Sequence, residues 1–281
     1  AMKERVLFLI RTYLWTVVVF TVAKLAFMFF CHEGNELSGI DIWQVISHGI
    51  TLDLSTALYI VSLPFLVMMA SLWISGRWII HTLRVYFLVI SFAFALAFVA
   101  DTSLYPFWGF KLDASCLQYL DTPTEAMASV TTGYIIWRFI VLLIATIIIL
   151  IGYLDAVRKL RTACEKSVSR KSAIYETIVG ILMIPLIVIG IRGGLDESTT
   201  NVGQVYFSQN QFLNHSAVNP VFNFFASFEK TATNDVTYHF MDDSESQRIV
   251  SELYNTQSID CDTLLTTQTP NIIDRDRKSV V

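Results

Sequence analysis

The chain has 281 residues, of which 54% are hydrophobic and only 16% are charged, and its mean hydropathy is +0.53. This composition excludes an ordinary soluble domain and indicates a membrane protein. The formal net charge of -4 gives no general basic character, so no nucleic-acid partner is expected.

Five apolar stretches are each long enough to cross a bilayer as a helix, and they cover residues 6–30, 45–74, 79–100, 134–154 and 174–191. The helical form is expected because unpaired backbone groups cost several kcal/mol each in hydrocarbon. Pro64 and Pro185 fall inside spans, where a kink is tolerated. Lys24 and Arg11 lie in the first span, and we expect their side chains to snorkel outward and inward, respectively.

The distribution of Lys and Arg predicts the orientation, because these residues are retained on the cytoplasmic side during insertion. Lys3 and Arg5 precede the first span, and Arg77 and Arg84 flank the second connection. The fourth connection contains Arg158, Lys159, Arg161, Lys166, Arg170 and Lys171. The connection 31–44 has none, and the connection 101–133 has only Lys111. We therefore expect the N-terminus to be cytoplasmic and every residue after Arg192 to lie outside the membrane.

The segments expected on the outer side are aromatic or amphipathic. Residues 101–113 open at the end of a span and are rich in aromatics, which is typical of an interfacial belt. After a Gly193-Gly194 turn, short helices are expected at 204–215 and 218–232. The second carries an apolar stripe, so it would lie along the membrane surface or under another domain. A third helix is expected to start at 242–245.

The end of the chain combines two different patterns. The sequence Pro270-Asn271-Ile272-Ile273 is typical of the start of a buried strand, but the apolar pattern breaks at Asp274. Residues 276–281 correspond to GAT CGG AAG AGC GTC GTG, a string that resembles a sequencing adapter. We interpret those six residues as an assembly artefact and residues 269–275 as the start of a truncated domain.

Several motifs together carry a family resemblance. They are Leu52-Asp53-Leu54-Ser55-Thr56, the segment from Asp101 through Trp108-Gly109 to Asp113, Arg192-Gly193-Gly194, Asn201-Val202-Gly203, and Asn214-His215 through Asn219-Pro220. In that order, on five spans, they resemble the lipoteichoic acid synthase-like proteins, membrane-bound members of the sulfatase and alkaline phosphatase superfamily. The resemblance covers residues 3 to 273 and implies a bacterial cytoplasmic (inner) membrane as the location.

The resemblance implies an all-α membrane protein with five transmembrane helices over 1–192, followed by an extracytoplasmic helical linker over 193–268. A large α/β sulfatase-like domain would then begin at 269–275. It also implies transfer of a phosphoglycerol or phosphoethanolamine headgroup from a phospholipid donor to an extracytoplasmic glycan or lipid acceptor. The divalent metal, Mn or Zn, and the nucleophile would belong to that further domain. No catalytic residue, metal ligand or cofactor is therefore assigned to this chain.

Candidate binding residues for a lipid headgroup are polar or aromatic groups at the outer level, since phosphate recognition favours Arg and oriented donors. They are Asp53, Asp101, Tyr105, Trp108, Arg138, Arg192 and Asn214. For Asp53, the alternative is a structural acid paired with Arg138 or Arg192. For Asn214 and for Asn219 before Pro220, the alternative is a cap or a turn. His32 and His215 each lack a second ligand at metal-binding spacing.

Two other functions fit the same composition. One is a membrane-bound sulfatase or phosphodiesterase that hydrolyses its substrate. The other is a polytopic membrane protein without enzymatic activity, such as a fragment of a transporter or a sensor. Against transport, the five spans show no paired, broken helices in an inverted repeat.

Overall fold

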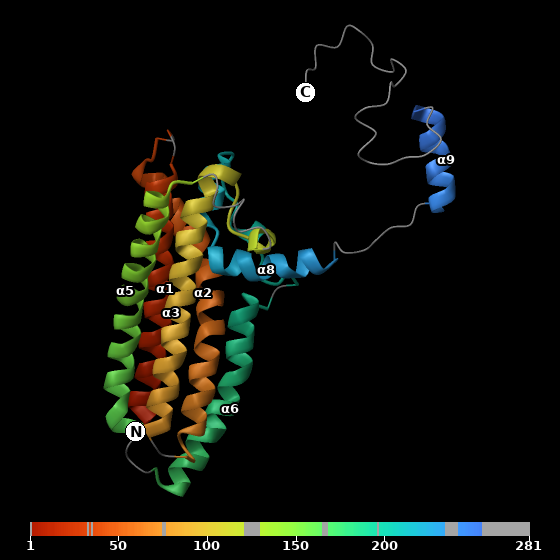
Figure 1. Ribbon diagram of the computed structural model, residues 1–281. Helices are drawn as coiled ribbons and strands as arrows, with labels where there is room; N and C mark the ends of the chain where they lie inside the picture. The colour runs from red at the N-terminus through yellow and green to blue at the C-terminus, as the bar shows by residue number, and fades with distance from the viewer. Residues whose placement is uncertain are drawn as a thin grey trace. The chain divides into compact units, whose positions relative to one another are not determined.

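The computed structural model describes residues 2–32, 34, 36–74, 77–120, 130–164, 168–195, 197–233 and 241–254. Every regular element in these ranges is a helix, and five of the helices are long and apolar enough to cross a membrane (Figure 1). The prediction of an all-α fold with five helices long and apolar enough to cross a membrane is therefore confirmed for the described residues. The expected strand start at 269–275 and the segment 276–281 lie outside the described residues.

The five long helices are α1 (Met2–Cys31), α2 (Gly39–Ala70), α3 (Arg77–Trp108), α5 (Thr132–Cys164) and α6 (Arg170–Arg192). Four of them contain the whole predicted span, whereas α2 ends before the predicted boundary at residue 74. α2 also begins earlier than predicted, because Ser38 and Asp41 form a reciprocal capping box at its start. α3 continues past the predicted end at residue 100 into the aromatic segment.

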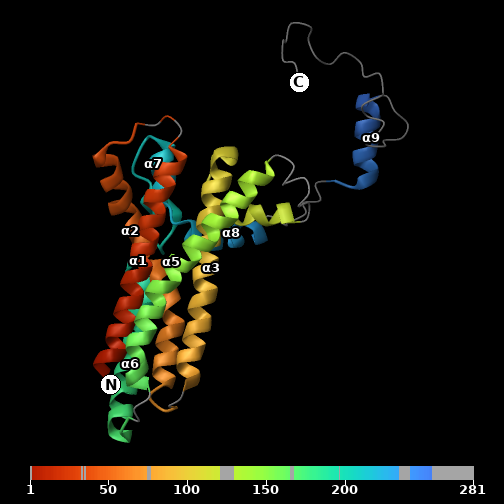
Figure 2. The same ribbon diagram turned by 60° about the vertical axis from the view of Figure 1, so that its left-hand side comes forward.

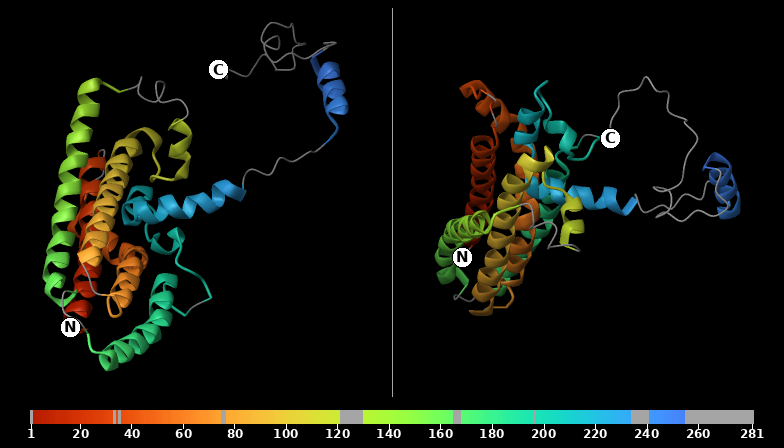
Figure 3. Two further views of the ribbon diagram at one scale, coloured as in Figure 1. Left: turned by 60° about the horizontal axis from the view of Figure 1, so that its bottom comes forward. Right: turned by 45° about the horizontal axis from the view of Figure 1, so that its top comes forward.

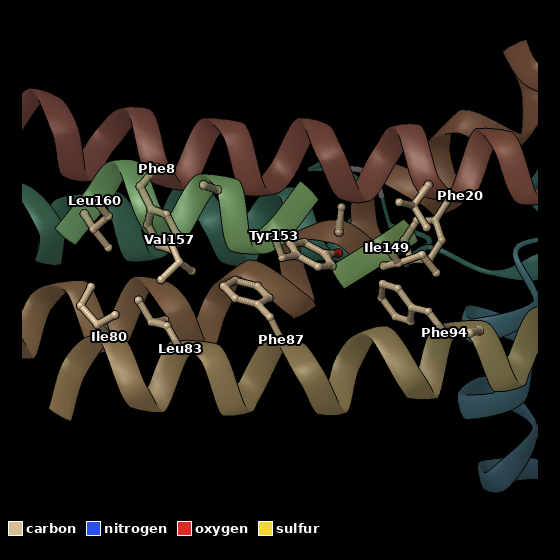
Figure 4. Close-up of a cluster of buried hydrophobic side chains, with 14 of the residues drawn as sticks. Phe8, Phe20, Ile80, Leu83, Phe87, Phe94, Ile149, Tyr153, Val157 and Leu160 are labelled. Atoms are coloured by element: carbon tan, nitrogen blue, oxygen red, sulfur yellow. The ribbon is translucent and has the colours of Figure 1, made fainter. Parts of the chain in front are cut away.

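The main core lies between α1, α3 and α5 (Figure 4). Phe8 of α1 packs against Phe87 of α3, and Phe20 of α1 packs against Phe94 of α3. The rings of Phe87 and Tyr153 of α5 stack with their centroids 4.5 Å apart. The Tyr153 hydroxyl forms a 2.8 Å hydrogen bond with Thr16 Oγ1, so its polar end has a partner inside the bundle. α2 packs against α1, and α6 packs against α2 at the edge of the bundle (Figure 3).

Three prolines lie inside the long helices, Pro64, Pro106 and Pro185, and each leaves a backbone carbonyl four residues earlier without its usual helical donor; for the first two, the replacement donor is seen. Upstream of Pro64, the Ile60 carbonyl accepts a 2.7 Å hydrogen bond from the Tyr86 hydroxyl of α3. Upstream of Pro106, the Thr102 carbonyl accepts one from Arg138 Nη2 of α5 at 3.4 Å. Side chains of neighbouring helices thus satisfy both carbonyls, which explains how α2 and α3 continue through their prolines.

The segment after α6 forms short helices: η2 (Val202–Val205), α7 (Gln211–Ala217) and α8 (Pro220–Thr233). The predicted helix at 218–232 matches α8, which lies across the axis of the bundle (Figure 1). The prediction of one helix over 204–215 is wrong. Residues 206–210 are not helical, because Asn214 Oδ1 accepts hydrogen bonds from the backbone of Phe207 and Ser208 and holds this stretch in a turn.

The chain divides into two compact units, residues 1–232 and 233–281. The first contains the bundle together with η1 (Ala114–Leu120), η2, α7 and nearly all of α8. The described helix of the second unit is α9 (Asp243–Tyr254), which begins within the predicted start at 242–245 and has Asp243 and Glu245 in its first turn.

Candidate functional site

Two buried ion pairs mark one end of the bundle, which we call the α7 end because α7 packs there against α1 and α2 (Figure 2). The first joins Lys24 of α1 to Asp53 of α2, and these residues are only 3% and 1% exposed. Lys24 Nζ also donates a 2.7 Å hydrogen bond to the Gly49 carbonyl. The expectation that Lys24 snorkels is therefore wrong: its ammonium turns inward because a carboxylate and a carbonyl lie within reach.

Asp53 has a second partner from the segment that follows the last span. Asn219 Nδ2 donates a 2.8 Å hydrogen bond to Asp53 Oδ1. The same side chain caps α8, since its Oδ1 accepts from the backbone N–H groups of Val221 and Phe222. The capping role predicted for Asn219 is confirmed. The partners suggested for Asp53, Arg138 and Arg192, are not the ones it has.

The second ion pair joins Asp101 of α3 to Lys111, which follows the end of that helix. Asp101 Oδ1 also accepts a 3.0 Å hydrogen bond from the Leu112 N–H, so the carboxylate turns the chain back onto α3. Lys111 Nζ lies over the Phe27 ring, 3.5 Å from its centroid, which gives the buried ammonium a second favourable contact. Both candidate acids at this end are therefore fully engaged.

Tyr105 links α3 to α7. Its hydroxyl and His215 Nδ1 form a 3.1 Å hydrogen bond, and its ring packs edge-on against Phe27. Burial lowers the pKa of His215, and the nearby Lys111 ammonium lowers it further. The imidazole is therefore a neutral hydrogen-bonding group at pH 7, and it is part of the attachment of α7.

Gly49 allows the closest backbone approach at this end. A Cβ at this position would collide with the Ala217 carbonyl at the end of α7 and with the Lys24 ammonium. Because the Ala217 carbonyl belongs to the backbone, it cannot move aside at low cost. The absence of a side chain at Gly49 thus lets α7 and Lys24 meet the same turn of α2.

Two side-chain hydrogen bonds attach loop 109–114 to α8. Asn223 Nδ2 donates a 2.8 Å hydrogen bond to the Leu112 carbonyl, and Ser227 Oγ accepts one of 2.7 Å from the Ala114 N–H. Trp108, a candidate residue at the end of α3, stacks on Phe110 with a centroid distance of 5.2 Å. These contacts order the aromatic segment against α8.

The other three candidates have local structural contacts. Asn214 is buried, and its side-chain amide forms hydrogen bonds with the backbone of residues 207–208. Oδ1 accepts from the N–H groups of Phe207 and Ser208, and Nδ2 donates to the Ser208 carbonyl at 2.7 Å. Arg138 donates to Thr102 and lies over the Tyr134 ring. Arg192 is exposed, and its Nη2 donates to the Glu197 carbonyl at 3.2 Å. None of these contacts joins the three residues to Asp53.

The arrangement is electrically balanced, with two ammonium groups and two carboxylates buried within one end of a helical bundle. Such a network is suited to holding the segment after α6 against the bundle, because each polar group has a partner and breaking a pair would leave a buried charge without one. Among the described residues, no group of three His, Cys, Asp or Glu side chains comes together to hold a metal ion. The metal implied by the family resemblance stays a prediction for a domain beyond this chain.

No family model, no curated protein and no solved structure matches the chain.

Sequence reasoning found Asp53, Asp101 and Tyr105 but missed the partners that define the site. Lys24, Lys111 and His215 were considered only as a snorkelling cation, a lone loop cation and a lone histidine. One signal was present in the sequence, since an acid and a base inside consecutive spans are each costly alone and usually pair. Nothing comparable pointed to Gly49 or to the contact between Asn219 and Asp53.

Proposed function

We propose that this chain is the membrane-anchoring and lipid-presenting part of a lipoteichoic acid synthase-like enzyme. That enzyme would transfer a phosphoglycerol or phosphoethanolamine headgroup from a phospholipid to an extracytoplasmic glycan or lipid acceptor. The chain itself would supply no catalytic residue. A sulfatase-like domain that follows it would supply the nucleophile and the divalent metal.

One observation carries this proposal. Sequence motifs that are far apart in the chain, and individually weak, contribute to one connected cluster at the α7 end: Asp53, the segment from Asp101 to Leu112, and the segment from Asn214 to Asn219. Residues of three of the five motifs thus contact one another, and chance similarity to separate motifs gives no reason for such contacts.

The cluster also has a mechanical consequence that suits a headgroup transferase. It fixes the segment after α6 to α2, to α3 and to the loop that follows α3, through Asn219, His215 and Asn223, respectively. A domain attached through this segment would be held at the depth of the lipid headgroups. Its search for a phospholipid donor would then be confined to two dimensions.

The reading frame that follows codon 273 in the genome gives the first test. We expect an apolar strand that ends in an acidic residue, then a Thr or Ser nucleophile, and later a cluster of His and Asp. A further span or a cytoplasmic signalling domain would contradict the proposal and favour a transporter or sensor.

Reconstitution gives the second test. The complete gene product, in phosphatidylglycerol liposomes with Mn²⁺, should release diacylglycerol and form a glycerophosphate adduct on an acceptor hydroxyl. Residues 1–281 alone and the complete protein with its nucleophile changed to Ala are the matched controls, and both should release none. Release of diacylglycerol by residues 1–281 would show that the chemistry has been assigned to the wrong part. Hydrolysis without any transfer would identify a phosphodiesterase.

A further inference from the structure

A second feature lies at the opposite end of the bundle, where the N-terminus and the start of α6 are found (Figure 1). A groove of about 370 Å³ lies between α1 and α6, against α2. This volume is within the range of small-ligand pockets. Its walls are almost entirely apolar and include Leu9, Tyr13, Phe65, Met69, Val179 and Met183.

One end of the groove is polar. Arg5 is only 4% exposed; its Nε donates a 3.0 Å hydrogen bond to Ser71 Oγ, and its Nη2 donates one of 3.4 Å to the Ser71 carbonyl. Its Nη1 lies 3.7 Å from Glu176 Oε2, and within the part of the chain that the structure describes it has no hydrogen-bond partner. A buried guanidinium N–H without an acceptor is unusual and indicates that an acceptor can be supplied from outside.

The shape of the groove suits a hydrocarbon chain. Between Glu176 and Ile187, both of which line it, α6 rises about 16 Å at 1.5 Å per residue. The groove thus extends from the end of the bundle towards the middle of the membrane-spanning region. Gly180 and Met69 face each other in its wall, and a Cβ on Gly180 would collide with the Met69 side chain.

The charge at this end favours an anionic headgroup. Lys3 is the second residue of α1, and Arg170 and Lys171 begin α6; all three are exposed, and they belong to the two helices that border the groove. Basic residues at such positions attract anionic lipid headgroups. The Arg5 and Glu176 pair is itself neutral and leaves this attraction unchanged.

We propose that the groove holds one acyl chain of an anionic phospholipid. An oxygen of the lipid's phosphate and glycerol-ester region accepts the hydrogen bond that Arg5 Nη1 offers, and the headgroup lies among Lys3, Arg170 and Lys171. The lipid comes from the leaflet at the N-terminal end of the bundle. The site is separate from the ion pairs at the α7 end, so it does not depend on the proposed enzymatic function.

The test uses the 281-residue chain reconstituted in nanodiscs with equal amounts of phosphatidylglycerol and phosphatidylcholine, then extracted in mild detergent and weighed by native mass spectrometry. We expect about one retained phosphatidylglycerol per chain and on the order of 100-fold less phosphatidylcholine, since Lys3, Arg170 and Lys171 each contribute about fivefold. Val179→Trp fills the groove and should abolish retention. Leu182→Trp changes an exposed residue of the same helix that does not line the groove, and it should retain the lipid.

Two further variants keep the test decisive. If Val179→Trp does not yield folded protein, Met183→Trp, at a more exposed wall position, replaces it with the same expected loss. The double variant Arg170→Gln, Lys171→Gln should lower the preference for phosphatidylglycerol about 30-fold, since each basic residue near the surface contributes about fivefold. Undiminished retention in the groove-filling variant, equal retention of the two lipids, or a second copy of the chain in place of lipid would overturn the proposal.

Discussion

At the scale of single residues, the α7 end depends on Asp53. Its two oxygens bind Lys24 of α1 and Asn219 ahead of α8, so one carboxylate joins three parts of the chain. Burying both charges is costly, and the pair is maintained only because each charge has the other and further hydrogen bonds. The same logic applies to Asp101, which binds Lys111 and the Leu112 N–H.

Replacing Asp53 by Asn should therefore destabilise the protein strongly. The change leaves the Lys24 ammonium buried without its carboxylate, which we expect to cost about 3–5 kcal/mol in the free energy of unfolding. Thermal unfolding in detergent would measure the loss. The double variant Lys24→Met, Asp53→Leu should recover most of it, because no unpaired charge then remains.

A matched control exists in the exposed ion pair between Lys159 and Asp155, whose side chains are 49% and 52% exposed. Asp155→Asn should change stability by less than about 1 kcal/mol, since solvent already screens that pair. A comparable loss in both variants would mean that burial does not determine the importance of Asp53.

At the scale of elements, α7 is placed by a close approach to α2. The Ala217 carbonyl at its end meets the turn of α2 that contains Gly49, and Phe212 of α7 stacks on Phe27 with centroids 6.0 Å apart. The attachment thus combines backbone contact, aromatic packing and the hydrogen bond between Tyr105 and His215.

Gly49→Ala should loosen this attachment. The added methyl group would push against the Ala217 carbonyl and the Lys24 ammonium, and overpacking of this kind costs about 1–3 kcal/mol. Hydrogen exchange of the amides of α7 would detect the change as faster exchange. Gly133→Ala, in α5, is the control because nothing lies within 4 Å of its added Cβ; it should be neutral or stabilise by up to about 1 kcal/mol. Unchanged exchange in Gly49→Ala would contradict the close approach.

The long helices could be predicted from the sequence, and most of the polar contacts could not. A bilayer requires about 20 apolar residues per helix, so hydropathy locates the five spans, although α3 and α5 continue to Trp108 and Cys164, beyond the predicted ends at residues 100 and 154. The failures have local causes. The predicted helix over 204–215 ignored the ability of the Asn214 amide to bind backbone groups, and Lys24 was expected outside because pairing with Asp53 depends on how α1 and α2 pack.

At the scale of the whole molecule, the five long helices leave many large apolar side chains exposed, which is what lipid contact requires. Among these five helices, α6 is the least enclosed, since only 11% of its most apolar stretch is buried. The exposed basic residues Lys3, Arg77, Arg170 and Lys171 are found at the N-terminal end of the bundle, away from the two ion pairs at the α7 end. The charge distribution predicts that this end faces the cytoplasm.

Labelling with a membrane-impermeant maleimide would test that orientation. In a chain whose four cysteines are replaced by Ser, we expect Ser198→Cys, after α6, to react in intact cells. Ser169→Cys, just before α6, should react only after the membrane is permeabilised. The opposite pattern would place the segment after Arg192 in the cytoplasm and would exclude the proposed presentation of lipid to an outer domain.

The hydrogen bond from Asn219 to Asp53 also has a consequence for biosynthesis. The two residues are 166 positions apart, so at ribosomal speeds of 5–20 residues per second roughly 8–33 s separate their emergence. During that interval, Asp53 of the newly made α2 can pair with Lys24 but lacks the side-chain amide of Asn219. Final closure of this end therefore has to wait until α6 has been made, which makes it a late step in maturation and a point at which incomplete chains remain open to quality-control proteases.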